Sequence, residues 1–266
     1  MTPTSRASAA PVAEVRFERA GAVAVITLDV PDRRNVLSGP MVAAIGQAFD
    51  AAEADDGVRC VVLTGAGKAF CAGAHLDTLE QAAAGQFEDV RTVYEGFLRV
   101  LASPLPTIAA VNGAAVGAGF NLALACDIRL AGASARFDTR FAALHLHPGG
   151  GHTWLLTRAV GSQQAMLAAL FGRAWDADAA RAVGLVADVV DDAALLATAV
   201  ELGQQLAAQS GAYVRRTTQT LRLAASDVVS HADVLAAETE AQRWSLGQPE
   251  FLAGLEAIRA QIAARR

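Results

Sequence analysis

The stretch that decides the fold is IAAVNGAAVGAGFNLALACD, residues 108–127. Its apolar beginning, together with Thr107, predicts a buried strand over 107–111, and a helix is expected to begin near Gly117. Gly113, Gly117 and Gly119 stand where the backbone must turn sharply or let another group approach closely. A helix that begins after such a turn leaves its first amide N–H groups unpaired at a positive end, where an anion can bind. The alternative is a strand-to-helix turn that uses glycine only for packing.

A second stretch of the same kind lies earlier in the chain. Residues 58–63 (VRCVVL) predict a short buried strand, and TGAGKAFCAGAHL follows at 64–76. The amides of residues 72–75 are expected to point into a cleft. Two such turns could each supply one N–H group to a single oxyanion, which is the recurring device of acyl-transfer and enolate chemistry.

With both turns in view, the chain resembles the enoyl-CoA hydratase/isomerase (crotonase) superfamily. The resemblance runs in the family's order from about Val15 to the C-terminus. It rests on PDRRNVLSGPM (31–41), GKAFCAGAHL (67–76), NGAAVGAGFNLALACDIRLA (112–131), HPGGGHTWLLTRAVG (147–161) and AARAVGLVADVV (179–190). It implies an α/β fold, a crotonase-like spiral of ββα units, followed by a helical C-terminal region that assembles trimers, often as a dimer of trimers.

Composition sets the outer limits of the interpretation. The 266 residues are 53% apolar, enough for one domain with an appendage. We expect a disordered tail over 1–11, the spiral core over 12–200 and the C-terminal helical region over 201–266. The N-terminus lacks the apolar run of a secretory signal, and no stretch is long enough for a membrane span.

Charge and cysteine usage indicate the compartment and the partners. The net charge of −5, without a basic stripe, argues against a nucleic-acid partner but not against an anionic ligand such as CoA. Cys60, Cys71 and Cys126 lie in apolar contexts without CxxC spacing. They are expected to be buried free thiols in a reducing compartment, here the cytoplasm, and not a metal site.

Periodicity and capping residues predict the remaining elements. A hairpin is expected from 12–17 and 23–28, and Ser38 is expected to cap a helix. Residues 77–85 are interpreted as a mobile segment, and a helix ended by prolines follows over 87–102. Later elements are strands at 127–130, 135–137 and 187–190, helices at 153–160 and 163–171, a helix led by Asp176, and a helical pattern from 192 onward.

The resemblance also assigns a site. The oxyanion donors are the N–H groups of Ala74 and Ala118. The two glutamates that activate water in the hydratases correspond to Asn121 and Phe141, neither of which can take up a proton, although the Asn121 amide could orient a water. The residues expected to bind the CoA thioester are Arg34, Val36, Ala72, Ala74, His75, Leu76, Ala118, Phe141 and Pro148.

Asp138 and His75 are candidates to replace the two missing acids. Asp138 could act as a shifted carboxylate, but a salt bridge with Arg140 is the favoured interpretation. His75, beside the first turn, could donate to the thioester oxygen or meet an α-proton, and is counted as catalytic with Ala74, Ala118 and Asn121. It could equally be a packing or surface histidine.

Three further histidines, His145, His147 and His152, surround PGGG, and their roles stay open. They lack a helix-borne HxxxH or an accompanying carboxylate cluster, so no metal is expected. Some relatives carry an aspartate nucleophile or base where Gly149 stands, so dehalogenase or dienoyl-isomerase chemistry is not supported.

The favoured function is binding of an acyl-CoA thioester, in fatty-acid or related metabolism, with stabilisation of its enolate or oxyanion by two backbone amides. Hydration or isomerisation would then need substitute groups. The alternatives are a non-catalytic acyl-CoA carrier, or another CoA reaction such as decarboxylation, in which departing CO2 makes a base unnecessary. No cofactor is expected beyond the CoA thioester itself, and the assembly is expected to be a homotrimer or hexamer.

Overall fold

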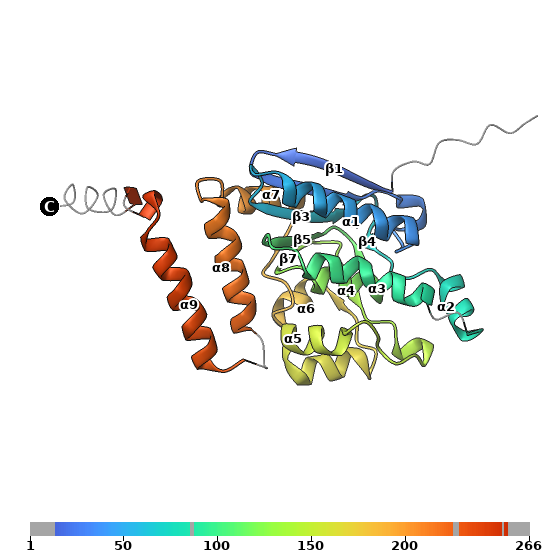
Figure 1. Ribbon diagram of the computed structural model, residues 1–266. Coiled ribbons are helices and arrows are strands. Elements are labelled where there is room, and N and C mark those ends of the chain that lie inside the picture. Colours follow the sequence, from blue (N-terminus) through green and yellow to red (C-terminus); the bar gives the residue numbers. More distant parts are fainter. Residues whose placement is uncertain (1–13, 86–87, 226–228, 252, 255–266) are drawn as a thin grey trace, which may run out of the picture.

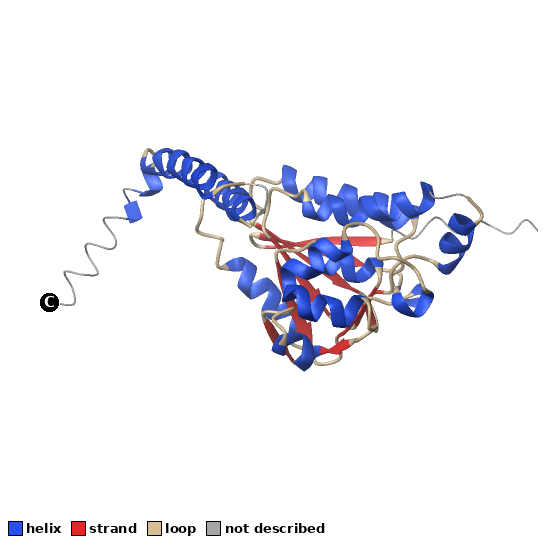
Figure 2. Cartoon of the chain, turned by 90° about the horizontal axis from the view of Figure 1, so that it is seen from below, coloured by secondary structure: helices blue, strands red, loops and turns tan. Residues whose placement is uncertain are grey.

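The computed structural model describes residues 14–85, 88–225, 229–251 and 253–254. The expected N-terminal tail, residues 1–11, lies outside the described residues. The strands form two sheets with helices packed beside them (Figures 1 and 2), and the first strand, Val15–Ala20, runs along the upper edge of the view in Figure 1. The strands are β1 Val15–Ala20, β2 Val23–Leu28, β3 Cys60–Gly65, β4 Ala69–Cys71, β5 Thr107–Val111, β6 Ala114–Val116, β7 Ile128–Gly132, β8 Arg136–Asp138, β9 Trp175–Asp176 and β10 Asp188–Val190.

The helices follow the strands in the pattern expected of an α/β chain. They are α1 Gly39–Ala54, α2 Leu76–Ala83, α3 Glu88–Leu101, α4 Ala118–Leu124, α5 His152–Ala169, α6 Ala177–Ala182, α7 Leu195–Gln204, α8 Gly211–Ala224 and α9 His231–Leu246, with short 3-10 turns at Pro31–Arg33 and Ala142–Leu144. Helix α5 is kinked at Gly161, which separates the two helices that the sequence predicts there.

The two sheets are built by a repeated unit, which confirms the predicted spiral. The larger sheet has the order β1-β2-β3-β5-β7-β10 and the smaller one β4-β6-β8-β9. Each of the successive pairs β3–β4, β5–β6 and β7–β8 places its first strand in the larger sheet and its second in the smaller one. Strands from successive units pair in parallel, and among the strand pairs of the described residues β1–β2 and β8–β9 are the antiparallel ones.

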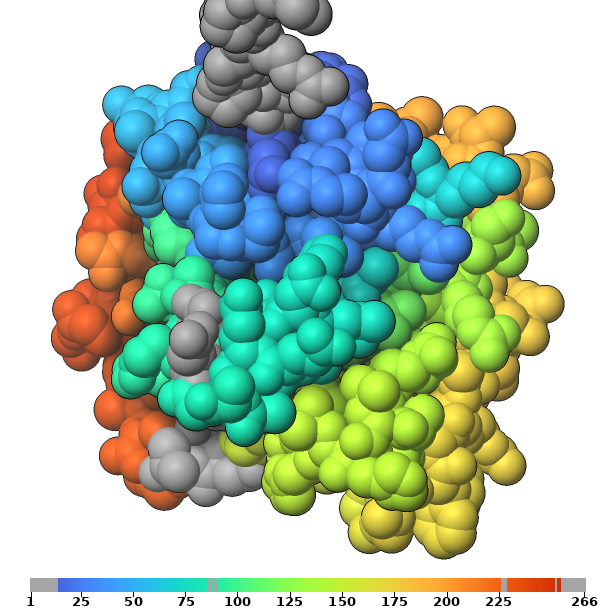
Figure 3. All heavy atoms as spheres, turned by 90° about the vertical axis from the view of Figure 1, so that its right-hand side faces the viewer, coloured from blue at the N-terminus to red at the C-terminus, as the bar shows by residue number. Residues whose placement is uncertain are grey.

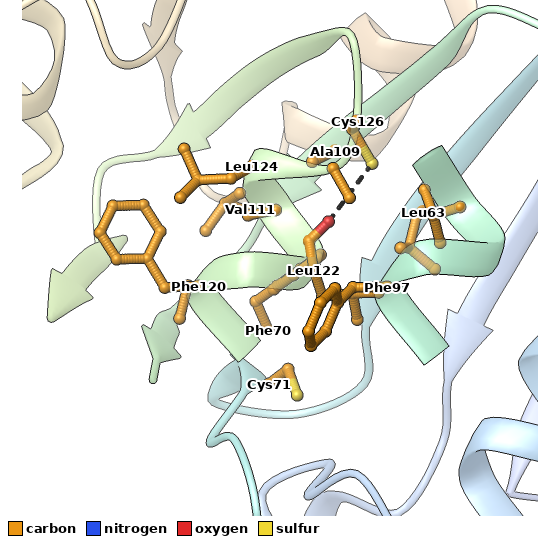
Figure 4. Close-up of a cluster of buried hydrophobic side chains, with 14 of the residues drawn as sticks. Leu63, Phe70, Cys71, Phe97, Ala109, Val111, Phe120, Leu122, Leu124 and Cys126 are labelled. Atoms are coloured by element: carbon orange, nitrogen blue, oxygen red, sulfur yellow. Dashed lines mark hydrogen bonds between the residues drawn. The ribbon is translucent and has the colours of Figure 1, made fainter. Parts of the chain in front are cut away.

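Both faces of the larger sheet are covered, which explains its nearly continuous apolar strands. One face meets α1 and the smaller sheet, and side chains from β3, β4, α3 and α4 gather there in one cluster (Figure 4), including Leu63, Phe70, Phe97 and Leu122. The opposite face, including Val62 of β3, packs against α7. The predicted division at residue 200 therefore falls inside a helix that covers the sheet.

The C-terminal helices extend from this core. Helix α9 packs along α8 and lies outermost in Figure 1. Both helices begin at serine caps, Ser210 and Ser230, whose side chains accept hydrogen bonds from backbone amides. None of the helices in the described ranges combines the length and apolar character that a bilayer span requires.

The glycines of the central stretch have the roles that the sequence predicts. Gly117 takes a φ of +54° and caps α4. At Gly119 an added Cβ would lie 2.1 Å from the carbonyl oxygen of Cys71, so only glycine lets α4 approach the end of β4. This approach brings the two glycine turns together.

Candidate functional site

The two glycine turns converge on one point. An ideal Cβ at Gly73 would lie 2.5 Å from the carbonyl oxygen of Val116 and 3.3 Å from the amide nitrogen of Ala118. The turn after β4 therefore lies directly against the turn before α4. Ala74 and Ala118, one from each turn, both line the same cavity.

The amides of Ala74 and Ala118 have no hydrogen-bond partner among the described residues. Ala118 is the first residue of α4, so its N–H group has no partner within the helix. Neither N–H group donates a hydrogen bond to another residue of the described part of the chain. The amide of Ala72, by contrast, donates to the carbonyl of Arg34 at 3.0 Å, so of the expected free amides this one is in use.

A buried asparagine holds the first turn in place. Asn35 is fully buried with a φ of +55°, and its Oδ1 accepts from the amide of Val30 at 2.9 Å. Its Nδ2 donates to the carbonyls of Ala69 at 2.9 Å and Ala66 at 3.0 Å. The loop before α1 is thereby tied to the turn between β3 and β4.

The cavity beside the two amides has a volume of about 870 Å³. Figure 3 shows the face where α2 and α3 (teal) meet the segment after β8 (yellow-green). The walls are mostly apolar, as expected of a small-molecule site. The predicted site residues that line the cavity are Ala72, Ala74, Leu76, Ala118, Asn121, Phe141 and Pro148.

Three predicted site residues do not line the cavity. Arg34 and Val36 lie in the neighbouring loop, where the Arg34 side chain is exposed. Arg33 beside it is paired with Glu14. His75 caps α2, its Nδ1 accepting a hydrogen bond from the amide of Asp77 at 3.3 Å, and it is not among the residues that line the cavity.

Asn121 is part of a buried polar chain. Its Nδ2 donates to the carbonyl of Gly149 at 3.1 Å, and its Oδ1 accepts from Nδ1–H of His152 at 2.5 Å. His152 is 1% exposed and stands edge-on to the rings of Phe141 and Phe120. Burial lowers the pKa of His152 to about 4, so the imidazole is neutral at physiological pH.

The two other histidines after β8, His145 and His147, have different surroundings. His145 is exposed and does not line the cavity, whereas His147 does line it and donates from Nδ1 to the carbonyl of Pro148 at 2.8 Å. Asp138 and Arg140 form the predicted salt bridge, at 2.8 Å. Within the described ranges, no group of three or more His, Cys, Asp or Glu side chains could hold a metal ion.

The three cysteines are free and buried, as the sequence predicts. Burial raises the pKa of each thiol to about 12. These thiols stay protonated at physiological pH and are poor nucleophiles.

Five polar residues that line the cavity are not among the predicted site residues: Glu80, Tyr94, Thr139, Arg140 and His147. Glu80 comes from α2, within a segment interpreted as mobile, and Tyr94 comes from α3. Tyr94 lies on α3 at helical spacing from Val90 and Val93, which also line the cavity. Nothing in the sequence indicates that the Tyr94 hydroxyl lies at a cavity.

Comparison with known proteins gives the family. The chain matches the family model described as Enoyl-CoA hydratase/isomerase over residues 18–257. It is 48% identical over 240 residues to "Probable enoyl-CoA hydratase EchA14" of Mycobacterium tuberculosis, covering 88% of this chain and 93% of the relative. It is 42% identical over 192 residues to 1,2-epoxyphenylacetyl-CoA isomerase of Escherichia coli, covering 70% and 73% of the two chains.

Solved structures agree with this result. The enoyl-CoA hydratase subunit I of Geobacillus kaustophilus superposes with a TM-score of 0.86 at 30% identity, covering 93% of this chain and 95% of the other. A Thermobifida fusca protein solved in complex with acetoacetyl-CoA superposes with a TM-score of 0.78 at 34% identity, covering 88% and 95%. The chain belongs to the enoyl-CoA hydratase/isomerase family, within the crotonase superfamily.

Proposed function

We propose that this protein binds an acyl-CoA thioester with the thioester carbonyl between the amides of Ala74 and Ala118. The observation that carries the proposal is that Ala74 and Ala118, whose N–H groups donate to no described residue, lie in adjoining turns and line one cavity. Two donors fixed by the fold stabilise negative charge on the carbonyl oxygen without reorganising during the reaction. The related protein solved with acetoacetyl-CoA supports this ligand class.

The proposed chemistry is stabilisation of an enolate or oxyanion, with weak classical hydration. Hydration needs groups that accept and donate protons beside one water. Asn121 and Phe141 can do neither, and both polar atoms of the Asn121 amide already bond within the protein. Isomerisation or hydration would need another proton-transfer group.

Two alternatives follow from the same site. A decarboxylation would leave an electron pair on the α-carbon as CO2 departs, and the two amides alone would stabilise the resulting enolate. A non-catalytic carrier would use them only to bind. The absence of a proton-accepting side chain at residues 121 and 141 favours both over hydration.

The test of the binding function is calorimetry combined with infrared spectroscopy. Butanoyl-CoA labelled with 13C at the carbonyl should bind saturably, and its C=O stretch should move to lower frequency on binding because two donors polarise it. Absence of saturable binding by any CoA thioester would refute the proposal. Binding with an unshifted stretch would refute the placement of the carbonyl.

Catalysis is separated from carriage by isotope exchange. An enolate-forming enzyme exchanges the α-hydrogens of a bound thioester with D2O, which mass spectrometry detects. Loss of CO2 from a 2-carboxyacyl-CoA would identify the decarboxylase alternative. A protein that binds thioesters but shows neither reaction is a carrier.

We further propose a trimeric or hexameric assembly formed through α8 and α9 in a reducing cytoplasm. These helices expose Tyr213, Leu221, Leu235 and Leu246, whose exposed fractions are 42%, 67%, 51% and 54%. Such exposed apolar side chains on packed helices favour an interface. Light scattering on the purified protein distinguishes one, three and six chains.

A further inference from the structure

Tyr94 places a hydroxyl group against the cavity wall at Gly149. An ideal Cβ at Gly149 would lie 2.4 Å from this hydroxyl oxygen, and one at Gly150 would lie 2.4 Å from the Phe97 ring. The two rings pack together with centroids 5.7 Å apart. The loop after β8 therefore lies directly on these two rings, which holds the phenol in place.

The pattern along α3 directs Tyr94 toward the cavity. Val90, Val93 and Tyr94 are spaced at i, i+3 and i+4, so they share one helix face, and all three line the cavity. Val93 and Phe97 are buried, while Tyr94 is only partly buried. The ring packs against Phe97, and its hydroxyl lies beside Gly149, which also lines the cavity.

The hydroxyl of Tyr94 makes no hydrogen bond to any residue in the described ranges. Other polar groups of the wall are engaged. Thr139 donates to the carbonyl of Ala168 at 3.0 Å, Arg140 pairs with Asp138, and His147 donates to the carbonyl of Pro148. Glu80 is exposed on α2. Tyr94 thus offers the cavity a donor that the protein itself does not use.

The position of this donor relative to the thioester follows from α4. Asn121 lies three residues after Ala118, on the same side of the helix, about one turn or roughly 5 Å along it. Asn121 bonds the carbonyl of Gly149, and Gly149 contacts the Tyr94 hydroxyl. A chain whose carbonyl is held at residue 118 would pass the hydroxyl a few carbons further on.

We propose that the Tyr94 hydroxyl selects acyl-CoA thioesters that carry an oxygen on C3 or C4 of the acyl group. This inference rests on the proposed function, because the thioester carbonyl sets the register. A hydrocarbon chain would displace water from the hydroxyl without forming a hydrogen bond to it. An oxygen on the acyl group would instead accept a hydrogen bond from the hydroxyl and so replace the displaced water. Sites built to bond a substrate oxygen discriminate strongly against analogues that lack it.

The test compares dissociation constants on the full-length protein by calorimetry. The ligands are butanoyl-CoA, 3-oxobutanoyl-CoA and 4-hydroxybutanoyl-CoA. The wild type should bind at least one oxygenated thioester about tenfold or more tightly than butanoyl-CoA. Tyr94→Phe should remove this preference and leave butanoyl-CoA affinity unchanged or improved. Tyr213→Phe, remote on α8, is the matched control and should behave like the wild type.

The outcomes separate this inference from the proposed function. Equal affinities of the wild type for all three ligands, or a preference that survives in Tyr94→Phe, would overturn the role of Tyr94 while leaving thioester binding intact. Failure of every CoA thioester to bind would instead refute the proposed function. Thermal unfolding of Tyr94→Phe shows whether the variant is folded, and circular dichroism provides a second check.

Discussion

The Nδ1–H group of His152 donates to Oδ1 of Asn121 across 2.5 Å in the protein interior, and this bond determines the orientation of the Asn121 amide. With Oδ1 held by the imidazole, Nδ2 is directed to the carbonyl of Gly149. The Nε2 atom of His152 is buried without a hydrogen bond to a described residue. The pair therefore works with a neutral imidazole, and protonation would bury an uncompensated charge.

His152 should make the protein sensitive to mild acid. Its pKa in the folded protein is about 4, below the usual 6.5, so the unfolded chain binds the proton more readily. Stability is complete above pH 6.5 and falls as pH drops toward 4, by about 3 kcal/mol. Urea unfolding at pH 7 and pH 4.5 measures this loss. His152→Gln can still donate to Asn121 but does not titrate, so its unfolding free energy should fall much less between pH 7 and pH 4.5. An equal fall in the variant would contradict the assignment of this pH dependence to His152.

Classical hydratase activity should be weak in the wild type and improve when carboxylates are restored. Turnover of crotonyl-CoA should fall well below the tens per second of ordinary enzymes, as measured by loss of enoyl-thioester absorbance. Asn121→Glu with Phe141→Glu should raise it at least about tenfold, since both proton-transfer groups return. Phe141→Glu alone is the control and should gain little. Fast wild-type turnover would defeat this prediction.

Ala118→Pro should remove one oxyanion donor without removing the helix. Proline is tolerated at the first position of a helix, where the missing N–H has no helical partner. The infrared shift of a bound 13C-labelled thioester should shrink, and any turnover should fall by about 3 kcal/mol of transition-state stabilisation. His231→Pro, at the first position of α9, is the matched control. A full shift in Ala118→Pro would show that this amide does not contact the carbonyl.

Gly149→Ala should destabilise the protein by about 1–3 kcal/mol, because the new methyl group collides with the Tyr94 hydroxyl 2.4 Å away. Combining it with Tyr94→Phe should recover part of the loss, since the next ring atom lies at 3.3 Å. Denaturant unfolding of the two single variants and the double variant forms a thermodynamic cycle. Strict additivity would mean that the hydroxyl does not occupy this place.

Asn35→Ala should cost about 2–4 kcal/mol of unfolding free energy, because buried carbonyls and the amide of Val30 lose their partners. Asn35→Gly loses the same bonds but relieves the positive φ. It should therefore be about 1 kcal/mol more stable than Asn35→Ala. Two variants of equal stability would show that the backbone conformation contributes nothing to the difference.

The sequence predicts most of the framework because its signals are local. Apolar runs predict β3 and β5, and the side chains of Ser38 and Asp176 cap α1 and α6 as expected. Strand β6 was not predicted, because three residues between glycines carry no periodic pattern. The sequence does not predict helix α2 either, because its capping residue, His75, is interpreted as a catalytic candidate.

The site was predicted in part. The resemblance, and not the glycine pattern alone, points to the main-chain amides of Ala74 and Ala118, and both residues line one cavity. The bond between Asn121 and His152 could not be predicted, because the two residues are thirty-one positions apart and only the folded chain brings them together. The contact between Tyr94 and Gly149 could not be predicted for the same reason, since it depends on how the loop after β8 packs against α3.

The contact between Gly73 and Ala118 has a consequence for the order of events in folding. The two N–H groups belong to distant parts of the chain, and the pairing of β4 with β6 is what brings them together. A chain in which β4 and β6 have not yet paired lacks both the neighbouring N–H groups and the cavity beside them. Ligand capture would therefore report completed folding, and a saturating thioester would raise the melting temperature by mass action.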